Sequence, residues 1–145
     1  YGNEIGMKNF KNPTDAEVRE DFPGGWAGDK VNNFSPEGRD ARETEIFNYV
    51  RTLARFRAQS PALTSGRTMQ YIPQNGVYVY FRYDARQTLM CILNTNDKES
   101  TLATRRFQER TGNFTTARDV VTNERVPLGP EIKLLPKSLT VLELQ

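Results

Sequence analysis

Hydrophobic residues recur at helical spacing in one stretch of the chain, residues 40–59. Charged residues occupy most of the positions between them, and the apolar set is Ile46, Phe47, Tyr49, Val50, Leu53, Ala54 and Phe56. This spacing predicts an amphipathic α-helix. Pro61 predicts the end of the helix, because a proline disfavours helical geometry in the residue before it. The apolar face is wide, so we expect the helix to pack on a large partner surface.

Residues 1–39 show neither helical nor strand periodicity. They carry nine glycines and prolines, a density that excludes any long helix or strand. Loops of this length in compact domains are usually lids, binding loops or disordered tails. Three large apolar residues, Phe22, Trp26 and Phe34, argue against a disordered tail. We therefore predict a long loop that packs on another surface.

Beyond residue 61 the chain is rich in β-branched and aromatic residues, arranged in short runs separated by turn residues such as Asn75-Gly76 and the segment 84–86. About seven short strands with such turns predict an antiparallel β-sandwich or barrel. Residues 104–111 are charged and typical of a turn. The predicted strands are Arg67–Ile72, Val77–Tyr83, Thr88–Thr95, Ser100–Ala103, Ala117–Val121, Ile132–Leu135 and Leu139–Leu144.

Two of these strands do not alternate between apolar and polar positions. Residues 77–81 are apolar at every position. In residues 139–144 the apolar positions shift from odd to even numbers midway along the strand. Either both faces of these strands are covered or the last strand contains a β-bulge. For the first strand we expect coverage, with the helix at 40–59 as the cover.

Composition and charge exclude several classes of protein. The 145 residues suit one domain with an attached piece, and 37% hydrophobic residues with 8 Phe, 6 Tyr and 1 Trp exclude disorder. The net charge is only +2 and no five like charges adjoin, so nucleic acid is not an expected partner. No apolar stretch reaches the roughly 18 residues that span a bilayer, and no signal-peptide pattern opens the chain.

The chain has no histidine and a single cysteine. This excludes serine–histidine and cysteine–histidine catalysis and zinc sites of the usual Cys/His kind. Cys91 lies in an apolar run, residues 89–93, and we expect it to be a small buried hydrophobe that forms no internal disulfide. We predict no metal site and no cofactor.

Carboxylates are the remaining acid or base candidates, and six of them lie in the loop: Glu4, Asp15, Glu17, Glu20, Asp21 and Asp29. Glycoside hydrolysis needs two carboxylates across the scissile bond, but spacing selects no pair among the six. Loop carboxylates are more often solvated or capping groups. The tyrosines at 78, 80 and 83 have two interpretations, an aromatic platform for sugar rings or half-buried sheet packing.

Two blocks of the loop carry a family resemblance. Residues 1–7 read YGNEIGM, and residues 15–19, DAEVR, run into DFPGGWAGD at 21–29, followed by Asn32 and Phe34. These blocks resemble the end of the catalytic barrel of the α-amylase family, glycoside hydrolase family 13. Within it they most resemble the neopullulanase/cyclomaltodextrinase type of Bacteroides starch-utilisation systems. The resemblance continues through GVYVYFRY at 76–83 and LNTNDKE at 93–99.

The resemblance implies a domain organisation. Residues 1–60 would be the terminal segment of a (β/α)8 barrel, with its last loop at 1–39 and its last helix at 40–59. Residues 61–145 would be the C-terminal β-sandwich. The chain begins inside a motif, at Tyr1, so we expect it to be a piece of something longer. Barrels of this kind have their active face at the strand C-termini, where such loops lie.

The resemblance also implies a sugar contact. In this family an Asp followed four positions later by an Arg, in the loop after the eighth barrel strand, helps hold a glucose unit beside the cleavage point. Asp15 and Arg19 match that spacing, and such a pair can accept from and donate to sugar hydroxyls. A salt bridge that only stabilises the loop is the alternative. Asn3 stands where the family motif usually has Asp, whereas Glu4 is retained.

The family's catalytic residues, two aspartates and a glutamate, would lie upstream of Tyr1, so we expect no catalytic residue here. The parent would hydrolyse α-1,4-glucans with retention, in the periplasm, while this chain alone would be non-catalytic. Its partners would be the remainder of the barrel and an α-glucan oligosaccharide, with self-association as a further expectation for the isolated chain. Two alternatives stay open: a carbohydrate-binding module that uses the tyrosines or Trp26, and an interaction domain without sugar contact.

Overall fold

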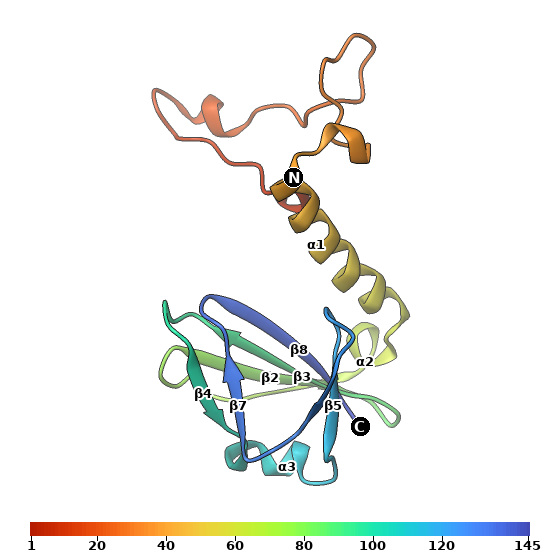
Figure 1. Cartoon of the computed structure of the whole chain (residues 1–145), viewed down its shortest axis with the longest axis vertical. Coiled ribbons are helices and arrows are strands. Elements are labelled where there is room, and N and C mark those ends of the chain that lie inside the picture. Colours follow the sequence, from red (N-terminus) through yellow and green to blue (C-terminus); the bar gives the residue numbers. More distant parts are fainter. The chain divides into compact units, whose positions relative to one another are not determined.

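The computed structural model describes all 145 residues, and the chain divides into two compact units, residues 1–52 and 53–145. Helix α1, Ala41–Gln59, begins in the first unit and ends in the second. Figure 1 shows the chain coloured from red at the N-terminus to blue at the C-terminus.

The first unit contains no strand and, before α1, only three short 3-10 turns: η1 Asn3–Ile5, η2 Asp15–Val18 and η3 Pro36–Gly38. The predicted long loop is thus confirmed. Gly24 shows why the loop needs glycine: its φ is 104°, and a Cβ there would lie 2.5 Å from the Cα of Asn32. The ring of Phe22 packs at 4.6 Å from that of Phe34, between centroids, whereas Trp26 is 82% exposed.

Helix α1 begins with a capping box. The backbone N–H of Glu43 donates to Asp40 Oδ1 at 2.8 Å, and the backbone N–H of Asp40 donates to Glu43 Oε2 at 2.9 Å. The helix ends at Gln59, as predicted, and Ser60 accepts a bond from Leu63 N to cap the short helix α2, Pro61–Thr64.

The second unit is an antiparallel β-sandwich. A six-stranded sheet has the order β1-β2-β3-β8-β5-β6, and β4 and β7 form a second sheet of two strands. All pairs are antiparallel. The strands are β1 Arg67–Gln70, β2 Val77–Tyr83, β3 Thr88–Asn94, β4 Ser100–Ala103, β5 Thr116–Asp119, β6 Arg125–Pro127, β7 Glu131–Leu134 and β8 Ser138–Leu144.

The predicted fold class, mainly β with an antiparallel sandwich, is therefore confirmed. Each of the seven predicted strands exists with bounds shifted by two residues or fewer, and β6 is the one strand that the sequence pattern missed. The Asn75-Gly76 turn has φ of 51° and 74°, the left-handed values of a tight hairpin. The charged stretch 104–111 forms a 3-10 turn, η4 Thr104–Phe107, and a short helix, α3 Gln108–Thr111.

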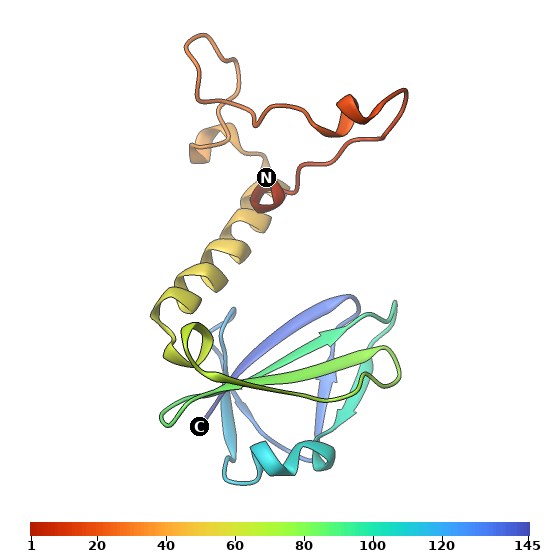
Figure 2. The ribbon, with the colours of Figure 1, turned by 180° about the vertical axis from the view of Figure 1, so that it is seen from behind.

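The main core lies between the two sheets. Both views show β4, β7 and the η4–α3 segment on one side of the large sheet (Figures 1 and 2). Phe81 and Met90 from the large sheet are fully buried, and Phe107 and Leu134 close the core from the other side. This core explains why alternate residues of β2, namely Val77, Val79 and Phe81, are buried.

A second, smaller cluster lies on the opposite face of the large sheet. Leu53 and Phe56, in the last turns of α1, pack against Cys91, Val120 and Val141. The structure therefore covers β2 and β3 on both faces, with the helix as predicted. Strand β8 is also covered on both faces, and its register against β3 is continuous from Leu89↔Glu143 to Asn94↔Ser138, so it carries no bulge there.

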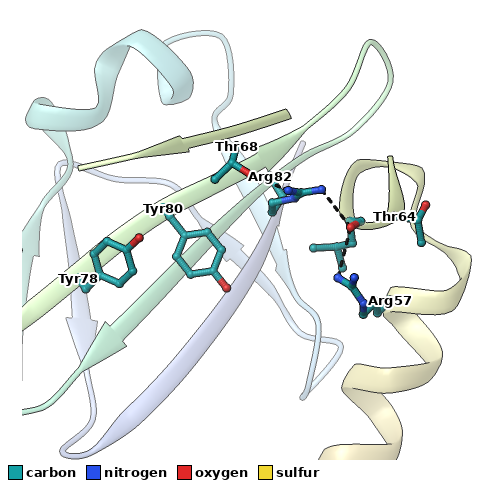
Figure 3. A pocket seen from close by; sticks show the side chains of 7 residues that line it. Arg57, Thr64, Thr68, Tyr78, Tyr80 and Arg82 are labelled. Atoms are coloured by element: carbon teal, nitrogen blue, oxygen red, sulfur yellow. Dashed lines mark hydrogen bonds between the residues drawn. The ribbon is translucent and has the colours of Figure 1, made fainter. Parts of the chain in front are cut away.

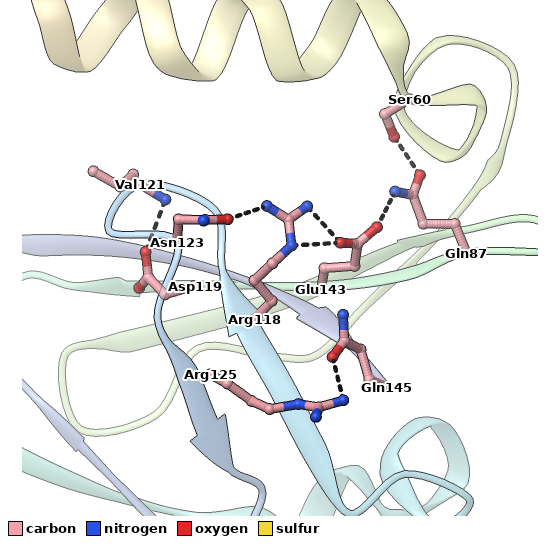
Figure 4. Close-up of polar contacts among 9 residues, drawn as sticks. All are labelled: Ser60, Gln87, Arg118, Asp119, Val121, Asn123, Arg125, Glu143 and Gln145. Atoms are coloured by element: carbon pink, nitrogen blue, oxygen red, sulfur yellow. Dashed lines mark hydrogen bonds and ion pairs between the residues drawn. The ribbon is translucent and has the colours of Figure 1, made fainter.

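A chain of polar contacts fixes the helix end to this face (Figure 4). Ser60 Oγ donates to Gln87 Oε1 at 2.5 Å, and Gln87 Nε2 donates to Glu143 Oε1 at 2.5 Å. Arg118 donates from Nε and Nη2 to Glu143 Oε2 at 3.0 and 2.6 Å. The Arg118 guanidinium also lies 5.7 Å from the centroid of the Phe56 ring. These contacts join the residues just before α2 and β3 to β8 and β5.

We expect Arg118→Ala to lower the free energy of unfolding by about 1 to 3 kcal/mol, because it leaves the partly buried Glu143 carboxylate without its cation. Arg125→Ala is the matched control, since exposed Arg125 donates only to Gln145 at 3.1 Å, and its loss should stay below about 0.5 kcal/mol. Urea unfolding followed by circular dichroism measures both. Equal losses would contradict the importance of the polar chain.

Candidate functional site

Asp15 and Arg19, the predicted sugar-contacting pair, lie on one exposed turn of the first unit. Asp15 opens η2, where Thr14 Oγ1 accepts from Ala16 N at 3.2 Å. One Asp15 oxygen lies 2.6 Å from Lys11 Nζ, and the other lies 3.8 Å from Arg19 Nη2. The structure thus brings the pair within ion-pair distance, and adds a lysine that the sequence reading missed. A sugar contact by the pair stays a prediction.

A hollow of about 340 Å³ lies next to this turn within the first unit. Tyr1 OH donates to the carbonyl of Glu20 at 2.6 Å, and Asn9 Nδ2 donates to Glu20 Oε1 at 2.8 Å. Asp29 accepts from the backbone N–H of Trp26 at 2.8 Å. Two of the six loop carboxylates therefore hold the loop's own conformation.

A larger groove, of about 540 Å³, lies within the second unit. Tyr78 and Tyr80 form its floor, since residues two apart on a strand point to the same face. Their ring centroids are 5.6 Å apart and the ring planes differ by 31°. The groove is lined by Arg57, Leu63, Thr64, Thr68, Tyr78, Tyr80 and Arg82 (Figure 3). The outward-facing residues of β2 therefore line this groove and also pack against α1.

Arg82 fixes the wall of this groove. It donates to the carbonyls of Ala62, Leu63 and Gly66 at 3.0 to 3.1 Å, and also bonds Thr68 Oγ1 at 2.5 Å. Arg57 Nη1 donates to the Leu63 carbonyl at 3.2 Å (Figure 3). Arg82 is therefore occupied by structural contacts, while most N–H groups of exposed Arg57 have no partner in the chain.

Burial raises the pKa of two groups at or beneath the floor of the groove, Tyr80 and Cys91. Burial of the hydroxyl, followed by the hydrogen-bonded Cys91 thiol, raises the pKa of Tyr80 to about 12. Burial also raises the pKa of Cys91, which pairs with Tyr80 across β2 and β3. Cys91 is 2% exposed, which confirms the expected small buried hydrophobe. The groove has no carboxylate in its lining, so its chemistry is binding by ring contacts and hydrogen bonds.

The structure shows no group of three or more His, Cys, Asp or Glu side chains placed to hold a metal ion. None of its helices combines the length and the apolar character needed to cross a membrane.

Comparison with protein families gives a match over the second unit. The family model described as the cyclo-malto-dextrinase C-terminal domain matches residues 68–143, just over half of the chain. The matched range begins within β1 and ends within β8, so it covers the β-sandwich.

Solved structures extend the similarity to the whole chain. AmyP in complex with maltose matches 99% of this chain at a TM-score of 0.73 and 20% identity. The α-amylase from Geobacillus thermoleovorans, complexed with acarbose, matches 100% of this chain at a TM-score of 0.69 and 17% identity. The Anoxybacillus α-amylase matches 99% of this chain at a TM-score of 0.65 and 19% identity. The matches cover 30%, 28% and 28% of those chains, so this chain spans less than a third of their length.

The raised pKa of Tyr80 predicts a loss of stability at high pH. The folded chain holds the phenol proton more tightly than the unfolded chain does, so the free energy of unfolding should fall between about pH 10 and pH 12. Cys91 acts in the same direction, from its ordinary value of 9.0 upward. Urea unfolding at a series of pH values measures the slope, which Tyr80→Phe should reduce. An unchanged slope in that variant would contradict the assignment.

Proposed function

The chain belongs to the cyclo-malto-dextrinase C-terminal domain family, and from that premise we propose that it is the C-terminal part of an enzyme that hydrolyses α-1,4-glucans. The chain itself contributes structure and a substrate-contacting loop and holds no catalytic residue. Residues 1–60 are the last loop and helix of a (β/α)8 barrel in this proposal, and residues 61–145 are the sandwich that follows it. Two of the similar solved chains, of which this one covers under a third, are described as AmyP in complex with maltose and as an α-amylase complexed with acarbose, which supports the substrate class.

The observation that carries the proposal is the unequal burial of apolar side chains. Of the nine exposed large hydrophobic residues, seven lie in residues 1–52, whereas only one of the 16 buried hydrophobic residues, Ile5, lies there. Exposed apolar side chains concentrated in one unit in this way indicate a surface that another protein segment covers. The proposal assigns that role to the remainder of the barrel. In the isolated chain the same surface would favour self-association.

The finer assignments rest on the motifs of the loop. DFPGGWAGD at 21–29 and the Asp15–Arg19 spacing favour the neopullulanase or cyclomaltodextrinase type of the Bacteroides starch-utilisation systems. Asp15 and Arg19 would hold a glucose unit of the substrate, because a carboxylate accepts from sugar hydroxyls and a guanidinium donates to them. Such enzymes work on glucans in the periplasm, where we place the parent.

Hydrolysis assays test the proposal. The 145-residue chain should release no reducing sugar from maltodextrin or pullulan, whereas a polypeptide that carries a barrel before this sequence should release it. In that enzyme Asp15→Asn and Arg19→Ala should each lower kcat/KM about tenfold to a hundredfold, because each removes a charged hydrogen bond to the substrate.

Lys11→Ala is the matched control for these two variants. It removes the closest ionic partner of Asp15, at 2.6 Å, without removing a proposed sugar contact. We expect kcat/KM to stay within about threefold of the parent value, as exposed ion pairs contribute little. Equal losses in all three variants would show that the pair only stabilises the loop.

Trp26, the single tryptophan, reports on the proposed cover of the loop. Because it is 82% exposed, its fluorescence in the isolated chain at low concentration should resemble that of indole in water and be fully open to acrylamide quenching. In the enzyme with its barrel, emission should shift to shorter wavelength and quenching should fall. A Trp26 already shielded in the dilute isolated chain would contradict the proposal.

A further inference from the structure

We propose that the groove above Tyr78 and Tyr80 is an α-glucan binding site that works without Asp15 and Arg19. The two rings come from adjacent outward positions of β2 and are tilted by only 31° to each other, with centroids 5.6 Å apart. Together they present one nearly continuous aromatic surface (Figure 3). The electron-rich face of an aromatic ring attracts the C–H groups of a sugar ring, so two neighbouring rings suit two consecutive sugars.

The groove also offers both hydrogen-bond donors and hydrogen-bond acceptors around these rings. Thr68 Oγ1 accepts from Arg82 and keeps its proton for a ligand, and Tyr78 OH donates to Gln70 Oε1 at 2.7 Å and can still accept. Exposed Arg57 uses one N–H for the Leu63 carbonyl and has others to donate. Donors and acceptors side by side match hydroxyl groups, each of which donates and accepts.

The charges of the groove favour a neutral ligand over an anion. Two arginines line it, yet Arg82 spends its N–H groups on three backbone carbonyls and Thr68. Of the two arginines, Arg57 is the one with most of its N–H groups unused, and one exposed guanidinium binds anions weakly. The aromatic floor is therefore the larger source of binding energy, which selects a ring-shaped, hydroxylated ligand.

The groove is preorganised. Tyr80 packs against the cluster of Cys91 and Val141, and Arg82 holds the α2 turn in place. Binding then orders few side chains, so little of the contact energy is lost as conformational entropy. All these residues lie in the second unit, and the loop of the first unit plays no part. That the saccharide is an α-1,4-glucan rests on the proposed function.

Titration of the ¹⁵N-labelled 145-residue chain with maltoheptaose tests the site. Amide shifts should change around Thr68, Tyr78 and Tyr80, and Tyr78→Ala should weaken binding at least fivefold. Tyr78→Phe, which keeps the ring, should stay within about twofold of the wild type. Leu135→Ala, which removes an exposed apolar side chain of this unit outside the groove, is the matched control and should bind like the wild type.

Three outcomes would overturn the proposal: no saturable shifts in the groove, equal affinity in Tyr78→Ala, or shifts confined to the loop and lost in Asp15→Asn. The shift map of the wild-type chain decides the question even where a variant unfolds. Cellohexaose, a β-1,4-glucan, separates this inference from the proposed function. Stronger Tyr78-dependent binding of cellohexaose would overturn the α-glucan assignment, while the hydrolysis assays independently test the parent's activity.

Discussion

The second apolar face of the six-stranded sheet is the constraint on which the rest of this structure depends. Four consecutive residues of β3, Leu89, Met90, Cys91 and Ile92, are at most 2% exposed, so neither face of the strand can meet water. The two-stranded sheet and Phe107 close one face. The other face needs a cover from outside the sandwich, and the last turns of α1 supply it. The helix end is therefore part of the sandwich core rather than a linker.

This cover is partial, and its edge creates the groove. Tyr80 belongs to the cluster beneath α1, whereas Tyr78, two residues earlier on the same face, lies outside that cluster. Polar groups fix where the cover ends, because Ser60, Gln87, Glu143 and Arg118 hold the helix terminus over β8 and β5 (Figure 4). The same helix thus completes the core on one side of Tyr80 and leaves a platform on the other.

The sequence predicted those features of the fold that depend on residues close together in the chain. The helix ends at Gln59 because of Pro61, and the unalternating β2 is covered twice, as its sequence indicated. Strand β6, only three residues with a charge and a proline, has no detectable period, and its pairing with β5 could not be seen in advance. Likewise, β3 pairs with β8 across more than 40 residues, an arrangement that depends on the whole core.

At each of the two candidate sites, the sequence predicted some residues, while the contacts with other parts of the chain could not be predicted. The four-residue separation of Asp15 and Arg19 matched the family motif and so selected the pair, but the ion pair with Lys11 depends on the course of the loop. Strand alternation put Tyr78 and Tyr80 on one face. The rim of their groove was not predictable, because Arg57 and Thr68 come from α1 and β1 and meet the tyrosines only in the folded unit.

The exposed Trp26 and the partly buried Tyr78 lie in two different chemical settings. Trp26 sits among glycines at 82% exposure, and its hydrogen bonds both join its backbone to Asp29: its N–H donates to the carboxylate, and its carbonyl accepts from the Asp29 N–H. Tyr78 has hydroxyl and guanidinium groups beside it that retain unused hydrogen-bonding capacity. A surface that another protein segment will cover is mainly apolar, because unpaired polar groups are costly to bury. A surface for a hydroxylated ligand needs such groups, so the loop suits a protein cover and the groove suits a sugar.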